Sequence, residues 1–182
     1  MGFKIDENGM RYLDNYYSFG VKEDEFSKKV YHTFKKGYNT YYNELLEMFC
    51  EALDSFGWDR ETWTKILITC VPSHEENGYG YNITRFIKDL CDRYGMINCS
   101  DLIRRHTFHQ KSTDGGDRSP RSHIETMELT KSIATNECMA ILVLDDITTT
   151  GGSLIAAKTV LAKTGKNPDF IHGIAIAKTS HI

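Results

Sequence analysis

Three runs of mainly hydrophobic residues stand out along the chain, and each is rich in β-branched side chains. They cover 66–71, 140–144 and 170–177. Runs of this length and composition are typical of strands buried on both faces of a sheet. Pro72 follows the first run directly and is expected to end that strand, because proline cannot donate to a strand ladder. The pattern therefore predicts three buried strands.

Between these runs, hydrophobic residues recur every three or four positions, which predicts amphipathic helices. The clearest are 41–56 and 83–94. Asn82 is a suitable N-cap for the second helix, and Gly95 follows its last hydrophobic residue. Shorter helices are predicted over 26–34, 124–133 and 154–161. The alternation of strand and helix predicts an α/β fold with a mainly parallel sheet flanked by helices.

The first 60 residues differ in composition from the rest, since they hold fourteen of the 21 aromatic residues. Asn8-Gly9 separates two short hydrophobic stretches and predicts a hairpin turn. We expect 1–60 to form a small N-terminal hood on a core formed by 61–182, within a single domain of 182 residues. The aromatic stripe of 41–56 is expected to pack in the core and not to form a stacking platform.

The segment from Arg104 to Pro120 is polar and lacks periodicity, so we predict a long flexible loop.

Charged residues make up 26% of the chain and the net charge is −3, which argues against a protein that binds nucleic acid through overall positive charge. The five cysteines are scattered and include no Cys-x-x-Cys pair, which argues against a zinc or disulfide framework. No hydrophobic run is long enough to span a bilayer. A cytoplasmic protein with no membrane partner is expected.

The segment 141–154 combines features that suit a phosphorylated ligand. A buried strand is expected to end at Asp145 and Asp146, and a turn rich in hydroxyl groups leads from there into a helix. Backbone N–H groups, hydroxyl groups and a helix N-terminus together favour phosphate, while the two carboxylates suit sugar hydroxyls or Mg²⁺. The turn residues are Thr148, Thr149, Thr150, Gly151, Gly152 and Ser153. No Gly-Lys-Ser/Thr follows, so the segment is not a P-loop.

Residues 144–153 resemble the loop that binds phosphoribosyl pyrophosphate (PRPP) in type I phosphoribosyltransferases. Weaker similarity extends to the ComF-like branch of that superfamily, a competence-associated branch related to amidophosphoribosyltransferases. The segments that carry this similarity are 34–37, 71–74, 80–82, the residues Arg105, Thr107, Gln110 and Arg118, and the ending 176–179. Tyr79 stands where that branch has an arginine, and the branch's Cys-x-x-Cys element is absent.

The resemblance implies a transferase that moves the ribose 5-phosphate group of PRPP to a nitrogen nucleophile and releases pyrophosphate, assisted by Mg²⁺. The turn Thr148–Ser153 would hold the 5-phosphate, and Asp145 and Asp146 would engage the ribose hydroxyls and the metal. Asp146 is the expected residue for any proton transfer. The pyrophosphate would be held by Ser73, His74, Arg104, Arg105 and Lys111. The alternative is a PRPP- or nucleotide-sensing protein without turnover, which the tyrosine at position 79 favours.

The small-molecule acceptor cannot be chosen from these residues among purine, pyrimidine and amine. His106, His109 and His123 lack the spacing of a metal cluster. His106 and His109 are expected to be phosphate contacts or ordinary loop residues. A homodimer is compatible with the supply of aromatic residues near the N-terminus.

Overall fold

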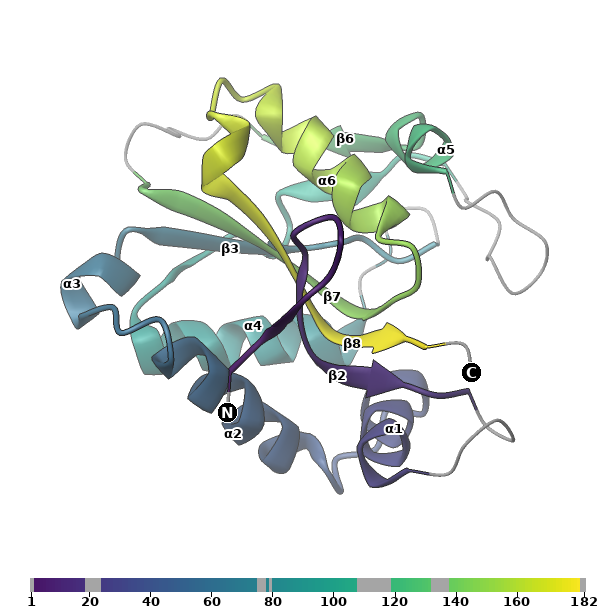
Figure 1. The fold of residues 1–182 in the computed structure, drawn as a ribbon. Coiled ribbons are helices and arrows are strands. Elements are labelled where there is room, and N and C mark those ends of the chain that lie inside the picture. The colour runs from purple at the N-terminus through teal and green to yellow at the C-terminus, as the bar shows by residue number, and fades with distance from the viewer. Residues whose placement is uncertain are drawn as a thin grey trace.

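A mostly parallel sheet of six strands forms the middle of the molecule, and helices cover both of its faces (Figure 1). The computed structural model describes residues 2–18, 24–74, 78, 80–107, 119–131 and 138–180. The strand order is β1-β2-β8-β7-β3-β4, and the one antiparallel pair in this sheet is β1 with β2. The α/β class and the mainly parallel sheet are thus as predicted. The strands are β1 (Lys4–Ile5), β2 (Arg11–Tyr16), β3 (Ile66–Cys70), β4 (Ile97–Asn98), β7 (Ala140–Thr148) and β8 (Ile171–Thr179).

Two groups of helices lie on opposite faces of this sheet (Figure 1). One group consists of α1 (Glu25–Val30), the π-helix η1 (Tyr31–Lys35), α2 (Tyr42–Asp54), α3 (Arg60–Trp63) and α4 (Tyr81–Tyr94). On the other face lie α5 (Pro120–Ile124), α6 (Gly152–Ala162) and a small antiparallel sheet of β5 (Ile103–Arg105) and β6 (Met127–Leu129). A 3-10 turn, η4 (Pro168–Phe170), precedes β8. No helix among the described residues is both long enough and apolar enough to cross a membrane.

The central strand β7 shows why the predicted runs are hydrophobic on both faces. Leu142 and Leu144 belong to the cluster formed with α2 and α4, whereas Ile141 and Val143 belong to the cluster formed with α6. Successive side chains of a strand point to opposite faces, so a strand between two helical layers needs hydrophobic residues at every position. All four side chains are at most 3% exposed.

The N-terminal segment is built into the main sheet. The predicted hairpin at Asn8-Gly9 is present and joins β1 to β2. However, β2 also pairs in parallel with β8, and Leu13 is buried in the same cluster as the central strands. The aromatic stripe packs in the core, as expected: Tyr42 and Phe49 are each 1% exposed. The hairpin of this segment therefore belongs to the main sheet, while α1 and α2 lie in the helical layer on one of its faces.

Three predicted elements differ from the structure. The strand predicted to end at Leu144 continues to Thr148, because β8 supplies backbone partners along its whole length. No helix covers 124–133; instead α5 ends at Ile124 and β6 follows. The prediction of a loop that begins at Arg104 is wrong for its first two residues, because Arg104 and Arg105 lie in β5. Most of the remainder of that segment lies outside the described residues.

Candidate functional site

The order in which successive strands join the sheet reverses between β3 and β7. From β3 the chain passes through α4 to β4 on one side, and from β7 it passes through α6 to β8 on the other side. Helices α4 and α6 cover opposite faces of the sheet (Figure 1). In open α/β sheets this arrangement leaves a crevice beyond the carboxyl ends of the two strands, where ligands bind. The last backbone pair between β3 and β7 is Cys70 with Leu144, so Asp145 begins the part of β7 that borders this crevice.

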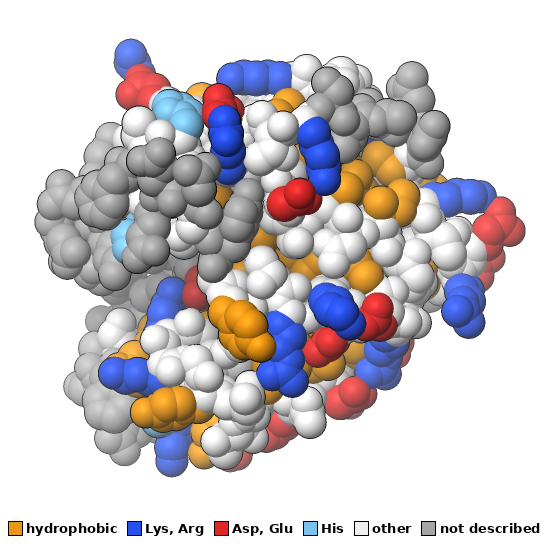
Figure 2. All heavy atoms as spheres, turned by 180° about the vertical axis from the view of Figure 1, so that it is seen from behind, with side chains coloured by type: hydrophobic (Ala, Val, Ile, Leu, Met, Phe, Trp, Pro, Cys, Tyr) orange, Lys and Arg blue, Asp and Glu red, His pale blue; other side chains and the backbone are white. Residues whose placement is uncertain are grey.

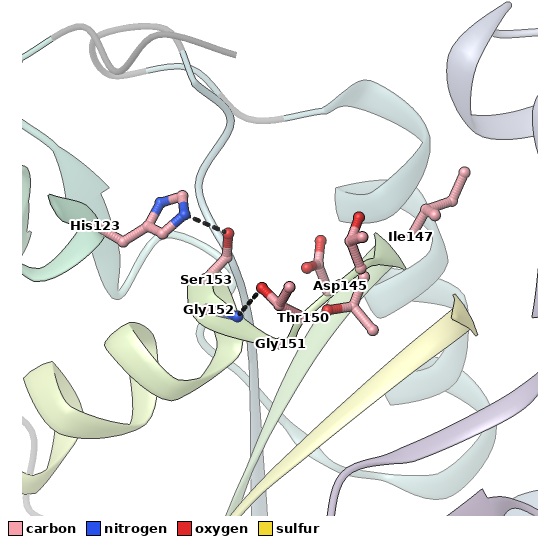
Figure 3. A pocket seen from close by; sticks show the side chains of 9 residues that line it. His123, Asp145, Ile147, Thr150, Gly151, Gly152 and Ser153 are labelled. Atoms are coloured by element: carbon pink, nitrogen blue, oxygen red, sulfur yellow. Dashed lines mark hydrogen bonds between the residues drawn. The ribbon is translucent and has the colours of Figure 1, made fainter. Parts of the chain in front are cut away.

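The turn between β7 and α6 leaves backbone donors available at the crevice. Gly151 is the N-cap of α6, has φ of +79°, and provides no side-chain cap for the first turn of the helix. The N–H group of Gly152 donates a hydrogen bond to Oγ1 of Thr150 over 3.4 Å (Figure 3). The first N–H groups of a helix have no partner within the helix and carry partial positive charge. An anion at this turn would therefore meet several aligned donors.

Gly151 also lies close to Met10 of the β1–β2 hairpin. A Cβ atom at this position would lie 1.8 Å from Cε of Met10, so the end of that side chain would have to shift. The positive φ disfavours a side chain here, whatever the space around it. The N-terminal hairpin thus packs against the turn.

A small pocket lies over this turn and collects most of the residues that the sequence singled out. Its lining consists of His123, Asp145, Ile147, Thr148, Thr149, Thr150, Gly151, Gly152 and Ser153 (Figure 3). All six residues predicted for phosphate binding are in this set, although Thr148 is only 4% exposed. The structure therefore brings the predicted turn and one of the two predicted carboxylates to a single pocket.

Asp145 and Asp146 are not equivalent, although they are adjacent in sequence. Asp145 lines the pocket, whereas Asp146 forms an ion pair with Lys35 of η1, with 2.8 Å between Oδ2 and Nζ. Burial, together with repulsion from Asp146, raises the pKa of Asp145 from 3.8 to about 7, despite the opposing charges of Lys35 and Arg105. Burial and the neighbouring charge therefore favour the protonated form of Asp145 more than they would favour that of an ordinary aspartate.

Lys35 is a site residue to which the sequence interpretation gave no role. Burial acts against its charged form, but the pairing with Asp146 and the charge of Asp145 outweigh this, so the pKa of Lys35 is raised. Lys35 ends a π-helix, a rare conformation that is often found at functional sites. Lys35 and Asp146 are 111 positions apart in the sequence, so no local pattern could reveal this pair.

Arg105 is buried next to the crevice, where it contacts the β3–α4 loop. Its Nε donates to the carbonyl oxygen of Ser73 over 2.8 Å, and its Nη1 donates to Oγ1 of Thr126. The side chain is 2% exposed. Burial lowers the pKa of Arg105 to about 10, which leaves it protonated at neutral pH. The structure thus connects two predicted pyrophosphate residues, Arg105 and Ser73, through a backbone carbonyl.

His123 is a second residue whose place in the site the sequence interpretation missed. It lies in α5, with Nε2 3.4 Å from Oγ of Ser153 and Nδ1 3.4 Å from Nη2 of Arg105. The available signal was Ser119-Pro120, an N-cap followed by proline at the first helical position, which marks the true start of the helix.

Of the other predicted pyrophosphate residues that the structure describes, Arg104 and His74 do not line the pocket. Arg104 faces outward and pairs with Glu128 across the β5–β6 ribbon. His74 follows β3 in the same loop as Ser73. Lys111, Tyr79, His109 and Arg118 lie outside the described residues.

The donor set fits magnesium only together with a ligand. Within the described ranges, no group of three or more His, Cys, Asp or Glu side chains gathers to hold a metal. Mg²⁺ commonly binds through one or two carboxylates plus the phosphate oxygens of a substrate. Asp145 is the better placed of the two carboxylates, since Asp146 is paired with Lys35.

Charges on the rest of the surface are largely paired. Figure 2 shows the molecule from behind, with Lys and Arg side chains interspersed among Asp and Glu side chains. Arg93 and Glu47, for example, join α4 to α2 over 2.7 Å. Such pairing does not favour a polyanion on this face.

Comparison with known proteins adds no relative. No protein-family model matches the chain, and no curated protein matches it.

Proposed function

We propose that the crevice binds PRPP and that the protein transfers its ribose 5-phosphate group to a nitrogen nucleophile, with release of pyrophosphate. The observation that carries the proposal is the pocket between Asp145 and the turn Thr149–Ser153, located where the strand order reverses. A phosphorylated sugar needs both halves of such a site. The turn offers N–H and hydroxyl donors to a phosphate, and the carboxylate offers acceptors to ribose hydroxyls.

The reaction requires that the bond between C1 of the ribose and the pyrophosphate oxygen breaks, with the electron pair leaving on the pyrophosphate. The nitrogen nucleophile forms the new bond to C1 and loses a proton. Little covalent work falls to the protein, so the binding residues act by positioning and by charge. A magnesium ion shared by Asp145 and the ligand's phosphates would supply positive charge at the leaving group.

We assign any proton transfer to Asp145 in place of the expected Asp146. Asp145 lines the pocket, and burial together with the charge of Asp146 raises its pKa toward the range that suits a general base. This role applies when magnesium is held by the oxygen atoms of the ligand and not by Asp145. Asp146 instead holds Lys35 at the crevice. The lysine would place a positive charge close to the ligand.

The test is release of pyrophosphate from PRPP with Mg²⁺ in the presence of a panel of purines, pyrimidines and amines. We expect release with at least one acceptor and a loss of at least ~100-fold in turnover for Asp145→Asn. Asp169→Asn is the matched control, because Asp169 is an exposed carboxylate in η4 on the surface. Wild-type turnover that Asp145→Asn leaves unchanged would contradict the assignment.

PRPP or nucleotide sensing without turnover is the second candidate. The ion pair between Lys35 and Asp146 favours it, because one of the two carboxylates already has a protein partner. Saturable PRPP binding without pyrophosphate release by any acceptor would support sensing over transfer.

A further inference from the structure

A continuous polar chain joins the two loops that border the crevice. It runs from the carbonyl oxygen of Ser73 through Arg105 and His123 to the hydroxyl of Ser153. Ser73 belongs to the loop after β3, and Ser153 belongs to the first turn of α6. The two connecting side chains come from neither loop, since Arg105 is in β5 and His123 is in α5.

The hydrogen bonds give this chain a defined direction. A guanidinium group only donates, so Nδ1 of His123 accepts from Arg105. The proton of the neutral imidazole is then on Nε2, which faces Oγ of Ser153 (Figure 3). The Ser153 hydroxyl accepts from His123 and keeps its own proton for a group in the pocket. Each link therefore orients the next.

Both connecting side chains of this polar chain are buried, which restricts their movement. Arg105 is 2% exposed and His123 is 7% exposed. Among the described residues, Arg105 forms no ion pair with a carboxylate, and its partners are a carbonyl, a hydroxyl and an imidazole. A buried cation is costly unless it is well hydrogen-bonded. Here the three hydrogen-bond partners of Arg105 offset that cost and fix the orientation of its guanidinium group.

We propose that Arg105 and His123 are positioning residues that hold the two anion-binding loops at the spacing required by a ligand with phosphate groups at both ends. This inference rests on the proposed function, because it assigns the turn to the 5-phosphate and the β3–α4 loop to the pyrophosphate. A ligand that reaches both loops gains affinity from their fixed spacing, whereas a ligand that reaches one loop does not.

The experiment compares one two-ended ligand with its two fragments. PRPP, ribose 5-phosphate and pyrophosphate are each titrated, with Mg²⁺, into the wild-type protein and the variants His123→Ala and Arg105→Met. We expect PRPP affinity to fall at least ~10-fold in both variants, while each fragment changes less than ~2-fold. His172→Ala is the matched control, because this histidine lies near the start of β8, lines a different pocket and is not part of the polar chain.

Two further variants keep the test decisive if His123→Ala or Arg105→Met proves unstable. His123→Gln retains both an acceptor and a donor and should keep most of the PRPP affinity. Arg105→Lys keeps the buried charge but loses the planar fork, so it should behave like Arg105→Met. An equal loss of affinity for PRPP and for either fragment, or no loss of affinity for PRPP, would overturn the positioning role of Arg105 and His123. Either result would leave the proposed function intact. Failure of the wild-type protein to bind PRPP would overturn both.

Discussion

Asp145 and Asp146 illustrate how neighbouring residues acquire different roles through the alternation of a strand. One side chain reaches the pocket beside α6, and the other pairs with Lys35 of η1. The pair itself was predictable from the sequence, because two acids after a hydrophobic run are conspicuous. Their separation was not, since it depends on β8 extending the ladder of β7 past Leu144 and on a lysine that is distant in sequence.

The raised pKa of Asp145 has a consequence for stability. A carboxyl group with a folded pKa near 7 and an unfolded pKa of 3.8 binds more protons when folded, so its contribution is fully present below pH 4 and is lost as the pH rises through 7. Asp145→Asn should therefore raise the free energy of unfolding at pH 8, on the order of 1 to 3 kcal/mol, with little difference near pH 4. Denaturant unfolding across this range measures it.

Asp146→Asn is the control for that experiment. It removes the partner of Lys35 and should not increase stability at pH 8, because it leaves a lysine at the crevice without its ion pair. A stability difference between wild type and Asp145→Asn that does not vary with pH would contradict the raised pKa.

Gly9 and Gly151 allow the effect of backbone conformation to be compared with the effect of a close packing contact. Both have positive φ, but a Cβ atom at Gly9 meets nothing within 4 Å, whereas at Gly151 it meets Met10. We expect Gly9→Ala to cost about 1 kcal/mol through backbone strain and Gly151→Ala to cost more, because the end of the buried Met10 side chain must also shift. Thermal unfolding of the two variants makes the comparison. Equal losses would show that Met10 does not support the turn.

Among the elements, those with strong periodicity or long hydrophobic runs were predictable, and the short ones were not. Helices α2 and α4 and strands β3 and β8 lie close to their predicted ranges, because each buries one full face or both faces. The ribbon of β5 and β6 was missed, since three residues per strand give no pattern and the polar side chains of Arg104 and Glu128 pair with each other. The helix that carries His123 was therefore expected over 124–133, whereas α5 spans Pro120–Ile124.

The π-helix η1 allows a test of how Lys35 acts on the crevice. The positive charge of Lys35 lowers the pKa of Asp145, so Lys35→Ala should raise that pKa further. Lys36→Ala is the matched control, since Lys36 lies over the ring of Tyr31 instead of at the acids. NMR titration of the aspartate carboxyl carbons, assigned with Asp145→Asn, measures the change. An unchanged or lowered pKa in Lys35→Ala would contradict the role given to the ion pair.

At the scale of the whole molecule, the N-terminal segment completes the sheet on which the site depends. Strand β2 pairs with β8, and Met10 packs against the turn at Gly151. The sequence indicated where the helices and strands of this segment lie but not that β2 would join the main sheet, because a parallel pair of strands so distant in sequence leaves no local signal.

Truncation tests this integration. A chain of residues 61–182 loses β2 together with Leu13, Tyr42 and Phe49, all of which are buried in the core. We expect it to lack cooperative thermal unfolding and dispersed NMR signals. A chain of residues 6–182, which lacks β1 and Phe3 but keeps Asp6 and its ion pair with Lys178, should still fold. Cooperative folding of the shorter chain would show that the first 60 residues are a removable hood after all.

The most direct test of the account is calorimetric titration of PRPP, with and without Mg²⁺, into the wild-type protein and the Asp145→Asn/Asp146→Asn variant. We predict saturable binding to the wild type that Mg²⁺ strengthens, and loss of that Mg²⁺ effect in the variant, because the proposal has these carboxylates contribute to magnesium binding together with the oxygen atoms of the ligand. Absence of saturable PRPP binding to the wild-type protein under either condition would contradict the account.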